Sequence, residues 1–228
     1  MSSIAIITAR GGSKRIPKKN IKEFCGKPII AYSIEAALSS GIFDEVMVST
    51  DSNEIKIIAE QYGASVPFLR SENTSNDFAT TADVIEEVIN NYKKLGKSFD
   101  FFACIYPTAP FVTGVKLAGA TMLLNEADAV ISVVKFSFPP QRAFVIKDGN
   151  VEFQYSEYKR TRSQDLEPIY HDCGQFYMCR VEPFLEHHNL ILPKTKPYIL
   201  EDDEVQDIDT MSDWKIAEAK YKVIHNGD

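Results

Sequence analysis

The chain has 228 residues, of which 44% are hydrophobic and 25% are charged, and its formal net charge is −7. This composition predicts a globular protein with a sizeable hydrophobic core in a single domain. The acidic balance argues against general binding to nucleic acid or to membrane surfaces, because such binding needs a basic surface.

The cysteines also bear on the class of protein. The four of them form no C-x-x-C pair, and in a chain of this length they are typical of reduced thiols in a cytoplasmic protein. No window has the ~20 apolar residues of a membrane span. The first residues lack the charged and apolar regions of a signal peptide. We therefore expect a soluble, cytoplasmic protein with no membrane partner.

The first strand is expected at Ile4–Thr8, an apolar run with β-branched residues that ends in a basic loop. Gly11 and Gly12 allow this loop to turn sharply and to bring backbone N–H groups close to a ligand. The cations around them are Arg10, Lys14, Arg15, Lys18 and Lys19. Because ligands of α/β sheets bind where strands end, the loop predicts an anionic small molecule, first a polyphosphate. A solvated basic turn is the alternative, since the loop matches no standard phosphate motif.

Strands and helices then alternate along the chain. The expected elements are a helix at 29–41, a strand at Glu45–Thr50, a helix at 53–63 capped by Asp51-Ser52, a strand at Val66–Leu69, a polar loop at Arg70–Thr80, a helix at 81–95, a strand at Phe101–Tyr106, a helix at 113–126 and a strand at Ala129–Lys135. This alternation predicts an α/β fold, a Rossmann-like, mostly parallel sheet flanked by helices.

Residues 136–172 interrupt the alternation. Two strand-like runs, Arg142–Ile146 and Val151–Tyr155, flank the hairpin signal Asp148-Gly149. We expect a small antiparallel insertion within a single domain of residues 1–228. Aromatic residues on such an arm more often pack against a partner than stand free, so the insertion predicts a homodimer. The alternative is a hairpin folded back on its own domain.

The last elements are expected to be a strand at Gly174–Cys179, a short helix at 183–188 and a closing helix at 213–224. Before the closing helix, Asp207 and Asp209 are two residues apart. On an extended backbone both carboxylates point the same way while Ile208 points into the core. Two convergent carboxylates beside phosphates suit Mg²⁺. The alternative is an acidic start to the last helix. With the basic loop, the pair would neutralise a polyphosphate from two sides.

Four segments, ARGGSKRIPKKN, STD, YPTAPF and DIDTMSDW, in that order resemble the sugar nucleotidyltransferases. The resemblance is closest to the cytidylyltransferases that activate nine-carbon α-keto acid sugars with CTP, the CMP-nonulosonic acid synthetases, and it spans essentially the whole chain. The segments IYPTAPFVT, TRSQDLEPIYHD and GQFY are most similar to the members that act on pseudaminic acid. Sialic acid members usually carry Q-P-T-S-P-L-R, and the change to Tyr106 favours a less hydroxylated sugar.

The resemblance implies a role for each matching residue. Nucleotide binding falls to Ala9, Arg10, Gly11, Gly12, Ser13, Lys14, Lys19, Asn20, Arg70, Ala79, Thr80 and Thr81, the last four shaping the cytosine pocket. Catalysis falls to Lys19, Arg10 and Asp209, with Lys19 stabilising charge on the α-phosphate. Mg²⁺ is implied at Asp207 and Asp209. The sugar would contact Tyr106, Arg162, Gln164, His171, Asp172, Gln175 and Tyr177. In the family the insertion crosses to a second subunit, so part of this site can come from a partner chain.

The implied reaction joins CTP to the sugar and releases pyrophosphate. Three other functions stay open at this point. They are a CMP-legionaminic, CMP-sialic or CMP-Kdo synthetase, a nucleotidyltransferase that uses UTP or dTTP, and a non-catalytic nucleotide-binding regulatory domain. The aspartate pair disfavours the last, because a pure binder needs no metal site. We interpret His171 as a structural group and His187-His188 as exposed helix surface.

Overall fold

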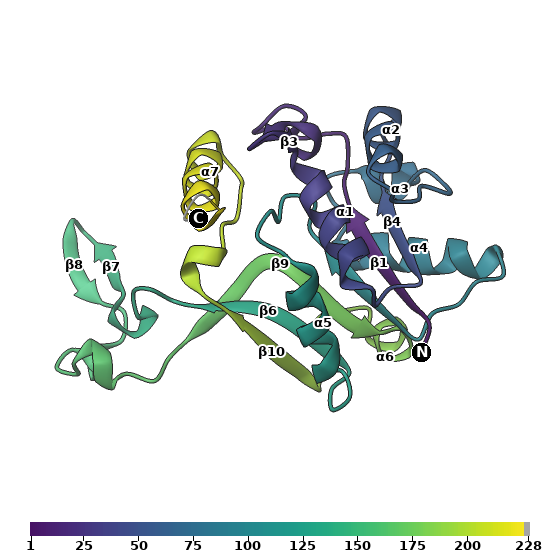
Figure 1. Ribbon diagram of the computed structural model, residues 1–228. Helices are drawn as coiled ribbons and strands as arrows, with labels where there is room; N and C mark the ends of the chain where they lie inside the picture. The colour runs from purple at the N-terminus through teal and green to yellow at the C-terminus, as the bar shows by residue number, and fades with distance from the viewer. Residues whose placement is uncertain (226–228) are drawn as a thin grey trace.

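The computed structural model describes residues 1–225, so the last three residues of the expected domain lie outside the described part. A six-stranded sheet runs through its centre in the order β10-β6-β9-β5-β1-β4 (Figure 1). Its strands are β1 (Ser3–Thr8), β4 (Glu45–Ser49), β5 (Phe101–Ile105), β6 (Ala129–Lys135), β9 (Tyr170–Arg180) and β10 (Thr195–Leu200). Only β9 runs antiparallel to its neighbours β5 and β6. The predicted α/β fold with a mostly parallel sheet is confirmed.

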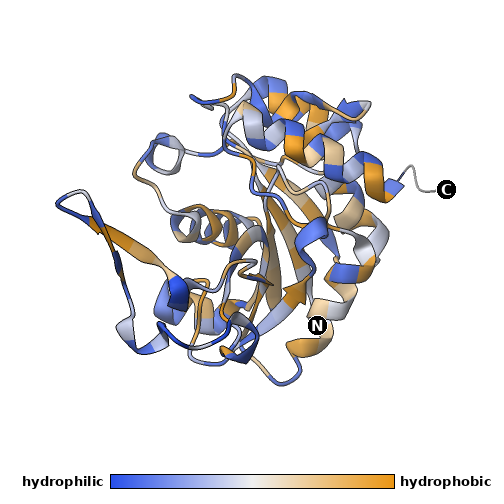
Figure 2. Cartoon of the chain, turned by 90° about the vertical axis from the view of Figure 1, so that its left-hand side faces the viewer, coloured by the Kyte–Doolittle hydropathy of each residue, from blue (hydrophilic) through white to orange (hydrophobic). Residues whose placement is uncertain are grey.

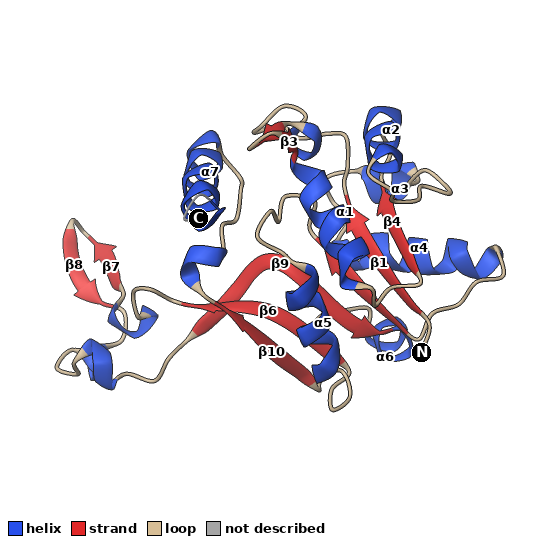
Figure 3. Cartoon of the chain, viewed as in Figure 1, coloured by secondary structure: helices blue, strands red, loops and turns tan. Residues whose placement is uncertain are grey.

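Helices cover both faces of this sheet (Figure 3). One face packs against α1 (Ile29–Ser40), α2 (Asn53–Gln61) and α5 (Gly114–Leu123), and the other against α4 (Thr81–Lys94) and α6 (Val181–His187). Successive strand residues point to opposite faces, so Ile7 and Ile6 belong to different halves of the core. Figure 2 shows the hydrophobic residues concentrated in the central strands. These two packed layers hold the strand ends in place.

The remaining elements of residues 1–225 are ten short ones and the closing helix. They are η1 (Lys19–Ile21), β2 (Glu23–Phe24), β3 (Lys27–Pro28), α3 (Glu72–Ser75), η2 (Pro140–Arg142), β7 (Phe144–Lys147), β8 (Asn150–Phe153), η3 (Ser156–Tyr158), η4 (Ser163–Asp165), η5 (Asp202–Glu204) and the closing helix α7 (Met211–His225). Within residues 1–225 no helix is long and apolar enough to cross a membrane. The four cysteines are free, as the prediction of reduced thiols requires.

Three details differ from the sequence-based expectations. The strand predicted at Val66–Leu69 is wrong: this stretch joins no ladder, and only Ser65 bridges to Met47, because Pro67 has no N–H to donate. Strand β10 was not predicted, since its Pro197 argues against a strand, yet an edge position tolerates that proline. Strand β9 starts inside the region assigned to the insertion.

The insertion forms an arm that stands away from the body of the chain (Figures 1 and 2). Strands β7 and β8 pair antiparallel around Asp148 and Gly149, both with positive φ, which is the turn that Asp-Gly favours. The predicted hairpin is confirmed, with its strand bounds shifted by about two residues at the outer ends. Phe144, Ile146 and Val151 are exposed on it. Its role in dimerisation stays a prediction.

Candidate active site

The predicted loop and the predicted aspartate pair meet at one cavity of about 510 Å³, where β1 and β5 end. Residues from three distant parts of the chain line it: Thr8, Arg10, Gly12, Ser13, Lys14, Arg15, Lys19, Asn20, Tyr106, Pro107, Thr108, Asp207 and Asp209. Most of the residues expected to bind phosphate or metal therefore share one space. Ala9 and Gly11 do not line it.

Two side chains hold the basic loop in shape. The Gly11 N–H donates to Oδ1 of Asp51 at 2.7 Å, and Nδ2 of the buried Asn20 donates to the Arg10 carbonyl at 2.9 Å. Ala9 is fully buried, and its N–H donates to the Ser49 carbonyl at 2.9 Å. A Cβ on Gly11 would lie 3.1 Å from the Cβ of Ser52, so glycine permits this close approach.

Lys19 connects the basic loop to the aspartate segment. Its Nζ donates to the Ile208 carbonyl at 2.7 Å and lies 3.7 Å from Oδ1 of Asp209, and only 20% of its side chain is exposed. Arg15 pairs with the same carboxylate at 2.8 Å. Both cations thus contact the segment that carries the candidate metal ligands.

Asp207 and Asp209 both line the cavity because Ile208 between them is anchored in the core. Ile208 is fully buried in a cluster with Phe111 and Trp214. Residues 205–209 belong to no helix or strand, and the expected alternation of side chains holds, with both aspartates at the cavity and Ile208 in the core. The alternative helix-entrance role is filled by Asp213, whose Oδ2 accepts from the Thr210 N–H at 2.7 Å.

The chemistry of the aspartate pair fits a divalent cation. Burial and the charge of Asp209 raise the pKa of Asp207 above its ordinary value, while Lys19 acts in the opposite direction. A cation between the carboxylates would relieve this repulsion, and carboxylate oxygens are what Mg²⁺ prefers. Among residues 1–225 no group of three or more His, Cys, Asp or Glu side chains is placed to hold a metal. Phosphate oxygens and water would have to complete the coordination.

The four residues expected at the cytosine line a second cavity of about 230 Å³, which shares Thr8 and Arg10 with the first. Arg70 is largely buried there, and its guanidinium donates to the Ser49 carbonyl at 2.7 Å and to Ser49 Oγ at 3.1 Å. Burial lowers the pKa of Arg70. Ala79, Thr80 and Thr81 line the same cavity.

A third cavity of about 450 Å³ joins the other two. It shares Tyr106 with the first and Thr80 and Thr81 with the second, and Asp172 and Tyr177 also line it. The rings of Tyr106 and Tyr177 meet edge to face, with centroids 5.8 Å apart. The Tyr177 hydroxyl donates to Asp172. Three residues expected to contact the sugar therefore lie together beside the basic cavity.

The structure does not bring the other four of those residues to that site. Arg162 lies on the arm and pairs with its neighbour Asp165 at 2.7 Å, and Gln164 lines a separate cavity of the arm. His171 packs on Phe136 with ring centroids 4.5 Å apart. Gln175 is fully buried and lines none of the described cavities.

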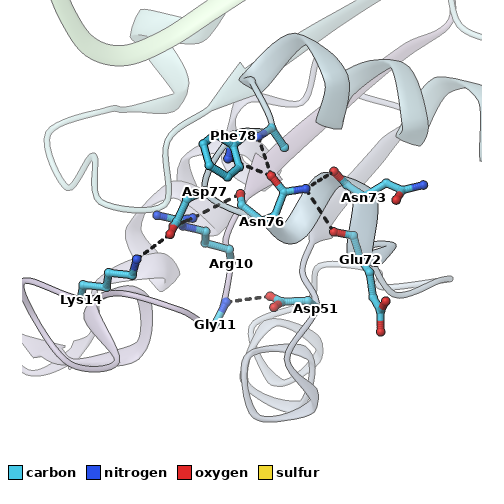
Figure 4. Close-up of polar contacts among 10 residues, drawn as sticks. Arg10, Gly11, Lys14, Asp51, Glu72, Asn73, Asn76, Asp77 and Phe78 are labelled. Atoms are coloured by element: carbon cyan, nitrogen blue, oxygen red, sulfur yellow. Dashed lines mark hydrogen bonds and ion pairs between the residues drawn. The ribbon is translucent and has the colours of Figure 1, made fainter.

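Asp77 is the main residue of the site that sequence reasoning missed. Its carboxylate binds Arg10 at 2.8 Å and Lys14 at 2.5 Å (Figure 4). Hydrogen bonds from Lys14 and Arg10 hold the pKa of Asp77 below its ordinary value. The Asn76 side chain accepts from the N–H groups of Phe78 and Ala79 and so shapes the turn that presents Asp77. The available signal was an acidic residue in the polar loop expected at Arg70–Thr80.

Comparison with known proteins gives a consistent result. A family model described as cytidylyltransferase matches residues 4–209. Pseudaminic acid cytidylyltransferase of Campylobacter jejuni is 41% identical, over 99% of this chain and 98% of the relative. CMP-N,N'-diacetyllegionaminic acid synthase of Legionella pneumophila is 37% identical, over 96% of this chain and 95% of the relative.

A solved structure of CMP:2-keto-3-deoxy-manno-octonic acid synthetase, complexed with CTP, has a similar fold. The two structures align with a TM-score of 0.73, and the alignment covers 98% of this chain and all of the other. At 16% sequence identity this likeness concerns the fold alone.

Proposed function

The chain belongs to the cytidylyltransferase family, and on this premise we propose that it joins CTP to a nine-carbon α-keto acid sugar, with pseudaminic acid preferred. The products would be the CMP-sugar and pyrophosphate. The observation that carries the proposal is the cavity in which Lys19 faces Asp207 and Asp209. The relatives of 41% and 37% identity, which act on two such sugars by name, support the substrate class.

We place the nucleotide across the first two cavities. The cytosine would lie between Arg70 and the Ala79–Thr81 segment, and the triphosphate would lie among the cations of the basic loop. Arg10 lines both cavities and would contact both ends of the nucleotide. Clusters of guanidinium, ammonium and backbone N–H groups are suited to phosphate oxygens.

We place the sugar across the boundary between the first and third cavities, at Tyr106. Its anionic carboxylate would face the basic cavity, since the third cavity carries the carboxyl groups of Asp83 and Asp172. The uncharged ring substituents would then lie against Tyr177 and the Leu190-Ile191 wall. This orientation puts the anomeric hydroxyl toward the triphosphate.

The proposed step forms a bond between the anomeric oxygen and the α-phosphorus and breaks the bond from that phosphorus to the β-phosphate oxygen. Pyrophosphate leaves, and the hydroxyl proton passes to solvent or to a carboxylate such as Asp209. Lys19 and Arg10 would stabilise the charge that develops on the phosphates. Asp207 and Asp209 would hold Mg²⁺, which when bound supplies further charge neutralisation at the phosphates.

We further propose that a second copy of the chain completes the sugar site. Arg162 and Gln164 lie on the arm, outside the cavity of their own chain, and the arm exposes Phe144 and Ile146. An arm with exposed apolar residues suits an interface between subunits. In that arrangement the guanidinium of Arg162 could pair with the sugar carboxylate.

Pyrophosphate release tests the proposal. CTP, UTP and dTTP are each combined with pseudaminic, legionaminic, N-acetylneuraminic and Kdo acids in the presence of Mg²⁺. We expect release only with CTP, and the highest kcat/KM with pseudaminic acid. Higher kcat/KM with legionaminic acid would favour the second candidate, to which the Legionella relative points. No release with any pair would overturn the enzyme proposal in favour of a nucleotide-binding domain.

A further inference from the structure

Strand β9 carries a bulge close to the candidate active site. Its pairing with β6 shifts register between Ile131 and Val133. Residues 173–176 of β9 consequently stand against Ser132 alone. Bulges re-aim the backbone and are frequent next to active sites, where they are specific features of a fold. Because the bulge interrupts the ladder between the two strands, other polar groups must satisfy its backbone and hold it in place.

Two side chains lock the bulge. Ser132 is fully buried on β6, and its Oγ accepts from the Phe176 N–H at 3.0 Å and donates to the Phe176 carbonyl at 2.9 Å. Asp172 acts from the other end of the bulge. Its Oδ1 accepts from the Gly174 N–H at 2.9 Å, and its Oδ2 accepts from the Tyr177 hydroxyl. These bonds replace the ladder and fix the left-handed turn at Gly174, where φ is 62°.

The locked bulge lies against Tyr106, which lines both the first and the third cavity. The Tyr106 N–H donates to the Gln175 carbonyl at 3.0 Å. A Cβ on Gly174 would lie 3.6 Å from Cδ2 and from Cε2 of the Tyr106 ring, so the glycine backbone packs beside that ring. A shift of the bulge would therefore move the ring that we place beside the sugar.

The bulge also lies against the segment that carries the candidate metal ligands. The same Cβ on Gly174 would lie 3.9 Å from Cγ of Asp207. Cys173 shares a buried cluster with Val205, two residues before Asp207. Because residues 205–209 belong to no helix or strand, their position depends on packing contacts of this kind. The bulge thus contacts one residue of the proposed sugar site and one of the proposed metal site.

We propose that Ser132 and Asp172 are positioning residues that lock the β9 bulge. Through the bulge they hold Asp207 and Tyr106 in the places that Mg²⁺ and the sugar require. For the identity of these ligands the inference rests on the proposed function. When either lock is lost, Mg²⁺ should add less to CTP binding and the sugar should bind less tightly, while CTP without metal should bind as before.

The choice of variants separates positioning from direct contact with a ligand. Ser132→Ala acts only through the bulge, because Ser132 is fully buried and lines none of the three joined cavities. Asp172→Ala removes the second lock from an exposed position, so the test stands even if loss of the buried hydroxyl prevents folding. Asp172→Asn is the conservative variant, since its carboxamide oxygen can still accept from the Gly174 N–H. Val130→Ala, in the core on the same strand, is the control for lost stability.

Isothermal titration calorimetry measures the Kd of CTP with Mg²⁺ and with EDTA, in the absence of sugar. The ratio of the two constants reports how much the metal adds to nucleotide binding. We expect this ratio to fall about tenfold in Ser132→Ala and in Asp172→Ala, at the low end of what outer partners of metal ligands contribute. The Kd in EDTA should stay within about twofold of wild type. Asp172→Asn and Val130→Ala should keep most of the wild-type ratio.

Steady-state kinetics tests the contact with Tyr106. At saturating Mg²⁺, Ser132→Ala should raise the KM for the sugar about fivefold and leave the KM for CTP within about twofold. Equal rises in both constants would indicate a general loss of structure and would overturn the inference. A fall of the Mg²⁺ ratio in Asp172→Ala alone would also overturn it, because Asp172 would then act as a ligand contact and not through the bulge.

A measurement without any ligand keeps this inference apart from the proposed function. Hydrogen exchange of peptides that cover residues 205–209 should be faster in Ser132→Ala and in Asp172→Ala than in the wild type, because the packing that restrains the segment is weakened. Val130→Ala should exchange there as the wild type does. Unchanged exchange in both lock variants would overturn the inference. Failure to release pyrophosphate with any sugar would overturn the proposed function and leave the exchange result unaffected.

Discussion

Asp77 and Arg10 form an ion pair at 2.8 Å, and the second oxygen of the same carboxylate binds Lys14. Both cations line the cavity assigned to the triphosphate. Asp77 is therefore an internal counterion for two of the charges that a phosphate would use. A triphosphate that takes these cations must displace Asp77.

Removal of this counterion should strengthen nucleotide binding. In Asp77→Asn, CTP and pyrophosphate should bind about fivefold more tightly at low salt, because partly exposed ion pairs of this kind contribute modestly. Cytidine, which has no phosphate to displace the carboxylate, should bind as before. Glu72→Gln is the control, since it removes the same charge from helix α3, which precedes Asp77 in the chain. Isothermal titration calorimetry measures all three ligands, and weaker CTP binding in Asp77→Asn would instead show that Asp77 orients the cations.

Lys19 should contribute more to turnover than any other cation of the loop. It is the least exposed of the loop cations in ion pairs, and it is held by the Ile208 carbonyl. Lys19→Ala should lower kcat about 10²- to 10³-fold, the usual cost of losing one preorganised donor at developing charge. Lys18→Asn is the control, because Lys18 pairs with Glu54 and asparagine tolerates its left-handed backbone. Near-normal steady-state kinetics of Lys19→Ala, with the circular dichroism spectrum intact, would remove Lys19 from the catalytic role.

Asp207 should destabilise the ligand-free fold at neutral pH. Burial and Asp209 raise its pKa in the folded protein, so folding disfavours the ionised form of Asp207. The resulting loss of stability is complete above the pKa of the folded state and absent below the pKa of the unfolded state. Asp207→Asn should therefore raise the Tm near neutral pH, with a gain that shrinks as the pH falls toward about 4. Asp203→Asn, an exposed carboxyl of η5, should leave the Tm unchanged.

Binding of Mg²⁺ and CTP should reverse the difference in Tm between the wild type and Asp207→Asn. Together they should raise the Tm of the wild type more than that of Asp207→Asn, since the variant has lost one carboxylate ligand. Differential scanning calorimetry across pH, with and without the ligands, checks both effects. A lower Tm for Asp207→Asn at neutral pH without ligand would contradict the repulsion argument.

The features that could be predicted from the sequence are those that depend on local patterns of residues. The apolar pattern at Ile4–Thr8 predicts a buried strand, and this strand positions the basic loop at one end of the first cavity. The apolar Ile208 between two aspartates predicts that it is buried, and its burial positions both aspartates at the other end. The Asp77 bridge depends on tertiary packing that brings two loops together, and no local pattern encodes it. Strand β10 was missed because Pro197 is disfavoured in most strands, and only its edge position explains it.

Because of where it lies, Arg162 can be used to distinguish a sugar site formed by one chain from a sugar site shared by two chains. Within its own chain Arg162 lies on the arm, paired with Asp165, and lines none of the three joined cavities. If the partner subunit's arm completes the sugar site, Arg162→Ala and Lys19→Ala should each be inactive alone. When the two variant chains are co-expressed, the mixed dimer contains one site with both residues intact.

We therefore expect the purified mixed dimer to recover about half the activity of the wild-type dimer, since one of its two sites would be complete. Separate affinity tags on the two chains allow the mixed species to be isolated, and pyrophosphate release measures its activity. A mixture of Lys19→Ala with Asp209→Ala is the control, because both changes affect residues of the same chain's cavity and no complete site can form. If Arg162 acted on its own chain, the Arg162→Ala and Lys19→Ala mixture would be as inactive as this control. An active Arg162→Ala homodimer would instead remove Arg162 from the sugar site altogether.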